Sequence, residues 1–97
     1  MKISKKIWVA SSIKWNVFVK RALCKKQLFK GHAYIVCTSP QERLLFEIVE
    51  AMWLSDYYKE ETVLAVCTTK EEAVEQIRVL IDSLYNVQSI TYADLLE

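Results

Sequence analysis

A repeated strand signal constrains the fold of this chain more than any other feature of its sequence. Residues 33–39 read AYIVCTS, and thirty positions later residues 63–69 read VLAVCTT. Both are short, continuous apolar runs that contain β-branched residues, which is typical of strands covered on both faces of a parallel sheet. We therefore predict two buried strands.

A helix start signal follows each predicted strand. Ser39 and Thr69 are hydroxyl residues with Glu42 and Glu72 three positions further on, which is the form of a capping box. Pro40 adds a residue that is favoured at the first position of a helix. The sequence therefore predicts two strand–helix units, with one helix covering about residues 44–58 and another beginning near residue 70.

The two predicted helices differ in how much apolar surface they carry. The helix that begins near residue 70 is amphipathic, and its apolar positions at helical spacing are Ala73, Val74, Ile77, Leu80, Ile81 and Leu84. Its polar side holds Glu71, Glu75, Arg78 and Asp82. In residues 44–58, by contrast, eleven of the fifteen residues are apolar or aromatic. A helix that is this apolar must be covered on more than one side.

This excess of apolar surface predicts a homodimer. Trp and Tyr are favoured as interface anchors, and a two-fold axis is the commonest way to close such a contact. We expect the contact to include Trp53, Leu54 and Tyr57. In the competing interpretation, an N-terminal helix or the tail at residues 92–96 covers the same face within one copy.

The N-terminal part of the chain supports two interpretations. Residues 6–11 read as a strand. Residues 12–30 fit a helix that ends at Gly31, but alternating apolar residues from Ile13 to Val19 also fit a strand. Both interpretations stay open from the sequence.

The order of the elements gives the fold class. The C-terminal part predicts a short strand at residues 87–90 and a last turn capped by Thr91. If residues 12–30 are helical, the order is βαβαβα, and connections of that length require parallel pairing. We therefore predict a single small α/β domain over residues 1–97, with a mostly parallel three-stranded sheet and helices packed on it.

The charges of the chain are divided unevenly. Residues 1–40 carry nine Lys and Arg and no acid, whereas residues 41–97 carry four Lys and Arg and all twelve acids. The basic residues of the segment 14–30, which contains aromatic residues, could bind a polyanion such as nucleic acid: Lys14, Lys20, Arg21, Lys25, Lys26 and Lys30. In the simpler interpretation, these cations form the solvated face of a helix whose aromatic residues are buried.

A Cys-x5-Arg sequence lies between the first predicted strand and the helix after it, from Cys37 to Arg43. It resembles the phosphate loop of cysteine-dependent phosphatases, in which a thiolate attacks phosphorus and the arginine binds its oxygens. However, the loop has no glycine, and Glu42 would repel the phosphate. The repeat explains the segment more simply, because Cys67 has the same place in the second unit, where Ala73 matches the arginine. We therefore predict that Cys37 is not a catalytic nucleophile.

The cysteines do not form a metal-binding pattern. Cys24, Cys37 and Cys67 show no Cys-x2–4-Cys spacing, and His32 is the only histidine. Cys37 and Cys67 stand at equivalent strand ends and would come close if those strands were neighbours, but free cysteine more commonly acts as a small buried hydrophobe. We expect no metal, no cofactor and no catalytic residue.

An odd number of cysteines without disulfide spacing fits a reducing compartment. No apolar stretch approaches the roughly 20 residues of a membrane-spanning helix. These features predict a cytoplasmic protein without a transmembrane segment. The sequence as a whole favours a non-enzymatic interaction or regulatory module that homodimerises. A nucleic-acid-associated protein that uses residues 14–30 is the alternative, and a cysteine-dependent phosphatase-like enzyme is a second alternative.

Overall fold

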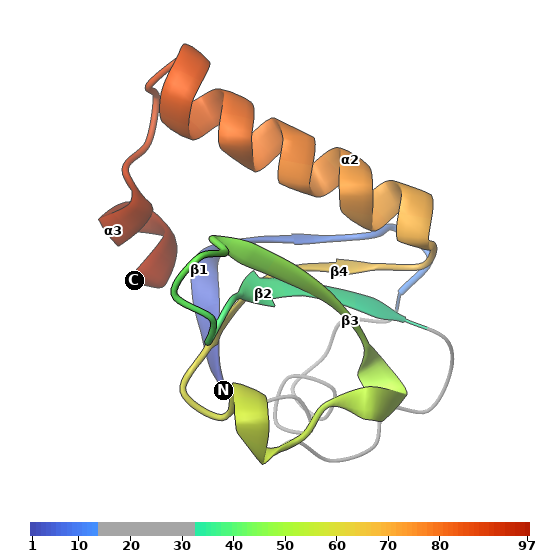
Figure 1. Cartoon of the computed structure of the whole chain (residues 1–97). Coiled ribbons are helices and arrows are strands. Elements are labelled where there is room, and N and C mark those ends of the chain that lie inside the picture. The colour runs from blue at the N-terminus through green and yellow to red at the C-terminus, as the bar shows by residue number, and fades with distance from the viewer. Residues whose placement is uncertain (14–32) are drawn as a thin grey trace.

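A four-stranded mixed sheet forms the centre of the protein in a computed structural model that describes residues 1–13 and 33–97 (Figure 1). The strands are β1 (Lys2–Val9), β2 (Tyr34–Thr38), β3 (Phe46–Glu50) and β4 (Thr62–Cys67), in the spatial order β1-β4-β2-β3. Only β1 and β4 are parallel, and the other two pairs are antiparallel. The predicted mostly parallel three-stranded sheet is therefore wrong.

The second strand–helix unit is confirmed. Helix α2 (Lys70–Ile81) begins directly after Thr69, whose hydroxyl accepts a hydrogen bond from the Glu72 N–H at 3.1 Å. The Glu72 carboxylate in turn accepts from the N–H of Thr68 at 2.8 Å. The first of these bonds satisfies an N–H group that a helix leaves free at its start, and the second holds the residue before the cap. Helix α2 then crosses one face of the sheet, over β4, β2 and β3 (Figure 1).

The helix predicted for residues 44–58 is absent, because the Ser39 hydroxyl takes part in a hairpin instead of a cap. It accepts a hydrogen bond from the Gln41 N–H at 3.0 Å and donates one to the Glu47 carboxylate, also at 3.0 Å. The chain therefore turns back after β2, and β3 pairs with it in antiparallel register. Two 3₁₀ turns, η1 (Ala51–Trp53) and η2 (Asp56–Tyr58), lead from β3 to β4.

Strand β4 is buried along its whole length because it has neighbours on both edges and apolar layers on both faces. In its pairing with β2, Val36 lies opposite Ala65 and Cys37 lies opposite Val63, so that Leu64 is an extra residue. Such a bulge changes which face the following side chains occupy. As a result, both Leu64 and Ala65 face α2, whereas Val63 faces the other side.

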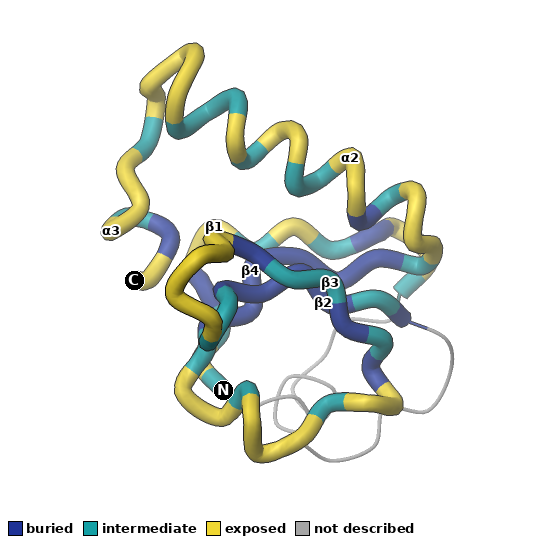
Figure 2. Tube along the Cα trace, viewed as in Figure 1, coloured by how far each residue is buried: buried dark blue, intermediate teal, exposed yellow. Residues whose placement is uncertain are grey.

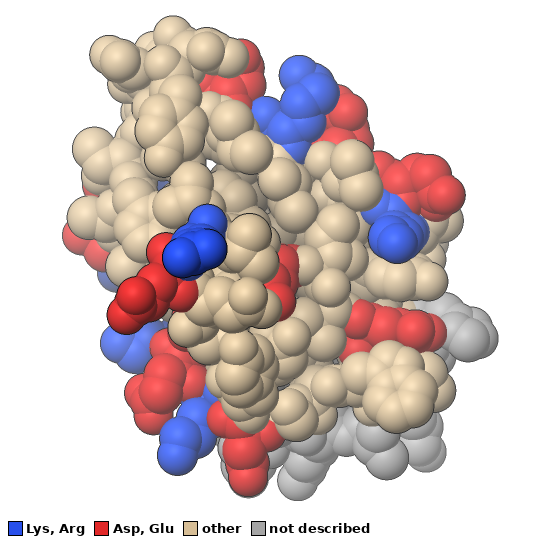
Figure 3. Space-filling view, in the orientation of Figure 1, with Lys and Arg blue, Asp and Glu red and all other residues tan. Residues whose placement is uncertain are grey.

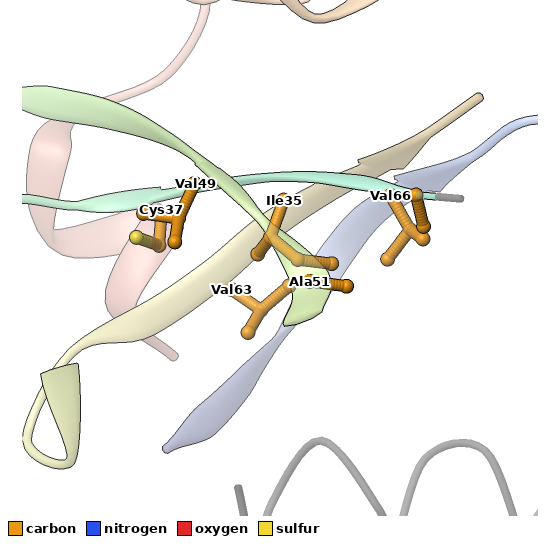
Figure 4. Close-up of a cluster of buried hydrophobic side chains, with 7 residues drawn as sticks. Ile35, Cys37, Val49, Ala51, Val63 and Val66 are labelled. Carbon is orange, nitrogen blue, oxygen red and sulfur yellow. The ribbon is translucent and has the colours of Figure 1, made fainter. Parts of the chain in front are cut away.

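The sheet separates two apolar clusters. The first lies on the face away from α2 and contains Ile35, Cys37, Val49, Ala51, Val63 and Val66 together with Ala33 (Figure 4). The second lies between the sheet and α2, and includes Val36, Phe46, Leu64 and Ala73. Figure 2 shows the buried strands in the middle of the molecule, while α2 and the η1–η2 segment are mainly exposed. Both the η1–η2 segment and the outer side of α2 are therefore accessible.

The secondary structure near the two ends of the chain agrees only partly with the prediction. Strand β1 starts at Lys2 rather than at residue 6. The strand predicted at residues 87–90 is absent, because α2 continues into a π-helical turn, η3 (Asp82–Asn86), and Gln88 has a φ of 55°. The turn capped by Thr91 is confirmed as helix α3 (Tyr92–Leu96). The alternatives for residues 12–30 lie, apart from 12 and 13, outside the described residues.

None of the helices within the described ranges has the length and apolar character needed to span a bilayer.

Candidate interaction surface

The segment from Ala51 to Tyr58, called the aromatic segment below, contains Trp53, the most exposed aromatic side chain among the described residues, and a second exposed aromatic, Tyr57. Trp53 is 69% exposed, Tyr57 is 56% exposed and Met52 is 48% exposed. Aromatic side chains of this size bury large areas when they contact a partner. The aromatic segment is therefore the first candidate for a binding surface.

Neighbouring side chains attach the aromatic segment firmly to the core. Ala51 is buried and its N–H donates to the Ala33 carbonyl at 2.9 Å. Leu54 and Tyr58 pack against the apolar cluster on the face away from α2. The rings of Tyr57 and Tyr58 meet edge to face, with centroids 5.1 Å apart. Trp53 and Tyr57 are thus exposed on turns that are held in place by the residues beside them. Because these turns are already ordered, the chain should lose less conformational entropy when a partner binds.

The three residues predicted for the dimer interface differ in their exposure to solvent. Trp53 and Tyr57 are open to solvent, whereas Leu54 is half-buried against the core. The sequence predicted surplus apolar surface on a helix over residues 44–58; Trp53 and Tyr57 are exposed in this region, but the helix is absent. The contact between this region and a second copy remains a prediction.

Cys37 lies near the C-terminal end of β2 and is fully buried. Burial, together with the nearby carboxylates of Glu47 and Glu61, raises the pKa of its thiol to about 12. Nucleophilic cysteines need the opposite environment, one that is electropositive and accessible. Arg43 is exposed in the connection between β2 and β3, so the segment is not a phosphate loop at a helix start.

The described residues offer no obvious site for a metal. In residues 1–13 and 33–97, no group of three or more His, Cys, Asp and Glu side chains is arranged to hold an ion. Cys67 is buried at the end of β4, and burial together with Glu72 raises its pKa to about 11. Both described cysteines therefore act as small core residues.

A groove that the sequence did not predict lies where the C-terminal end of α2, the β2–β3 connection and α3 meet. Its volume is about 460 Å³, and its walls include Leu45, Leu84, Tyr85, Ile90 and Tyr92. This volume is in the range of small-molecule sites. The described residues that line it are apolar, aromatic or uncharged polar.

The outer side of α2 also differs from the sequence prediction. Ala73, Ile77 and Leu80 face the sheet as expected. Val74 and Ile81, however, are 53% and 41% exposed. The apolar residues of this helix extend around more of its circumference than the sheet covers. The sequence signal for this exposed apolar surface was the pair of apolar residues, Val74 and Ile81, at the edge of the apolar side.

All six basic residues proposed for polyanion binding, from Lys14 to Lys30, lie outside the described residues. On the face seen in Figure 3, the described acidic and basic side chains are interspersed and form no single positive surface. A continuous positive surface is the usual electrostatic footprint of a nucleic-acid-binding protein. The face in this view therefore offers no positive surface that could bind a polyanion together with residues 14–30.

Comparison with known protein families, with curated proteins and with solved structures found no match to this chain. The geometry of the aromatic segment and of α2 is therefore the basis for inferring function.

Proposed function

We propose that this protein is a non-enzymatic interaction module, of regulatory or scaffolding type, that forms a homodimer through the aromatic segment. The observation that supports this most strongly is the contrast between exposed Trp53 and Tyr57 and the buried residues that hold them, Ala51, Leu54 and Tyr58. Rigid, exposed aromatic side chains are the type of residue that dominates binding energy in protein interfaces.

The exposed side chains of the aromatic segment offer apolar area for a contact between two copies. Removing the exposed part of a Trp side chain from water contributes about 3 kcal/mol. Trp53, Tyr57 and Met52 would contribute from both copies, giving on the order of 10 kcal/mol or more before costs. Association itself costs roughly 4–15 kcal/mol. Because the gain and the cost are of similar size, we expect a weak to moderate affinity, which is why the dimer is tested at high micromolar concentration.

A second copy can serve as the partner because charges of both signs, Asp56 and Lys59, lie within and directly after the aromatic segment. Asp56 precedes Tyr57, and Lys59 follows Tyr58. In a two-fold contact, each group of one copy can approach its opposite in the other copy.

The test is the molar mass of the protein in solution. We expect light scattering to give the mass of a dimer for the wild type at high micromolar concentration. Trp53→Glu places a charge at the centre of the proposed contact, so this variant should be a stable monomer. Trp53 is chosen over Leu54 because substitution of half-buried Leu54 would also disturb the core.

The matched control is Tyr85→Glu. Tyr85 is an exposed aromatic residue of η3, on the opposite side of the sheet from the aromatic segment. This variant should keep the wild-type mass. A wild type that is monomeric at high micromolar concentration would contradict the proposal, as would loss of the dimer in Tyr85→Glu but not in Trp53→Glu.

A further inference from the structure

Helix α2 has an apolar stripe that the sheet does not cover. Val74, Ile77 and Ile81 are spaced as i, i+3 and i+7, and they line a shallow depression of about 390 Å³ together with Arg78, Asp82 and Asn86. Val74 and Ile81 are exposed, and Ile77 is half-buried between this stripe and the core. A groove with this spacing is the form in which one helix receives another.

Acids outnumber bases around this stripe, and Arg78 offsets the charge of one of them, Glu75. Residues 70–86 carry four acids and two bases. Glu71 and Glu75 are exposed, and the Arg78 side chain is bound to Glu75 through a hydrogen bond of 3.0 Å from its Nε. Along the upper margin of Figure 3, where Figure 1 shows α2, acidic groups flank the basic ones.

We propose that the outer face of α2 is a docking surface for a basic amphipathic helix of a partner protein. The apolar residues of that helix would pack on Val74, Ile77 and Ile81, and its Lys or Arg side chains would approach Glu71 and Glu75. This surface is separate from the proposed dimer contact, because α2 and the aromatic segment lie on opposite sides of the sheet. One module would therefore bind a second copy on one side and a basic helix on the other.

The acidic surroundings select this partner over an acidic one. Bringing Glu or Asp to the positions beside Glu71 and Glu75 would place like charges together and oppose binding. A basic helix gains attraction at the same positions, and salt should weaken that part of its affinity. The apolar stripe supplies the remaining affinity, which salt should change little.

Two synthetic peptides provide a direct test. Each has about 18 residues, roughly five turns of helix, with the same leucine face. One carries Lys beside that face and the other carries Glu. We expect fluorescence anisotropy to show binding of the Lys peptide to the full-length protein, weakening with salt, and at least about tenfold weaker binding of the Glu peptide.

Matched variants then locate the contact. Ile81 and Val79 lie on the same helix and are 41% and 40% exposed, but Val79 is not part of the depression. Both Ile81→Glu and Val79→Glu add one negative charge. Ile81→Glu should raise the Kd for the Lys peptide about tenfold or more, while Val79→Glu should leave it near the wild-type value. Circular dichroism and thermal unfolding of both variants identify any effect that comes from misfolding.

The outcomes separate this proposal from the proposed dimer. Trp53→Glu should keep the affinity for the Lys peptide, because it alters the other side of the sheet. Equal binding of the two peptides, or equal affinities of folded Ile81→Glu and Val79→Glu, would overturn the proposal. So would a change in molar mass caused by Ile81→Glu alone, since the α2 face would then be an interface between copies.

Discussion

Cys37 and Cys67 lie on neighbouring strands, but at opposite ends of them and on opposite faces of the sheet. Cys37 of β2 pairs with Val63 at the start of β4, whereas Cys67 at the end of β4 pairs with Tyr34. Cys37 belongs to the apolar cluster away from α2, and Cys67 to the cluster beneath α2. Strand ends that are equivalent in the sequence repeat are separated because the two strands are antiparallel.

This arrangement predicts that Cys37 and Cys67 stay reduced and unreactive in the native protein. A disulfide needs Cβ atoms that point toward each other at close range, and these two side chains leave the sheet in opposite directions. Mass spectrometry after alkylation with iodoacetamide at pH 8 should find both residues unmodified in native protein and modified in urea. Rapid native alkylation of Cys37, at the rate of a free thiol, would contradict this prediction.

The raised thiol pKa values also predict loss of stability at alkaline pH. The thiol pKa of Cys37 is about 12 in the folded protein and 9.0 without burial, so above pH 9 the unfolded chain releases a proton that the folded chain keeps. The free energy of unfolding should then fall by up to about 1.4 kcal/mol per pH unit for this group. Cys67 adds to the same trend up to about pH 11.

Urea unfolding at pH 7.5, 9 and 10 measures this slope. Cys37→Ala should be less stable than the wild type at pH 7.5 because it leaves a small cavity. Its stability should nevertheless fall less steeply between pH 9 and pH 10, since one of the buried thiols is gone. Parallel curves for the wild type and Cys37→Ala would show that Cys37 does not titrate differently in the two states.

The Thr69 hydroxyl should stabilise the start of α2. It accepts the Glu72 N–H at 3.1 Å, and loss of such a cap costs about 1 kcal/mol. Thr69→Ala should therefore lower the free energy of unfolding by about this amount in urea titrations. Thr69→Ser keeps the oxygen and should remain within a few tenths of a kcal/mol of the wild type. Equal losses in both variants would assign the effect to the lost methyl group and not to the cap.

Any polyanion binding should reside in residues 14–30. Charge reversal of Lys20, Arg21, Lys25 and Lys26 should abolish it, and raising the salt concentration should weaken it because bound counterions are released. Titrations of labelled single- and double-stranded DNA and RNA at two salt concentrations provide the measurement. Reversal of Lys2, Lys5 and Lys6 in β1 is the control with the same sign of charge. Absence of binding at low salt would remove the nucleic-acid alternative.

Some elements were predictable because their signals act between residues close in sequence. The caps at Thr69 and Thr91 each bind an N–H three residues away, and both helices begin where the sequence indicated. The apolar run of β4 identified a buried strand, since its composition alone requires cover on both faces. These features needed no knowledge of the partner strands.

The region after β2 carried an equally good helix signal and became a strand. A cap contributes about 1 kcal/mol, whereas each large apolar side chain that is buried contributes about 1.5–3 kcal/mol. Pairing β3 with β2 buries Phe46 against α2 and Val49 on the other face. The Ser39 hydroxyl then binds Glu47, eight residues away, in place of a helix N–H.

The sequence by itself determined that this chain has a buried strand, an amphipathic helix after it and more apolar surface than one small core can cover. Only the tertiary structure decided where that extra surface is exposed. The sheet beneath α2 covers Ala73 but leaves Val74 and Ile81 open, and the turns after β3 bury Ala51 but expose Trp53. Residues of similar polarity differ in exposure because contacts between distant segments, which composition and periodicity do not encode, determine which side of each element is covered.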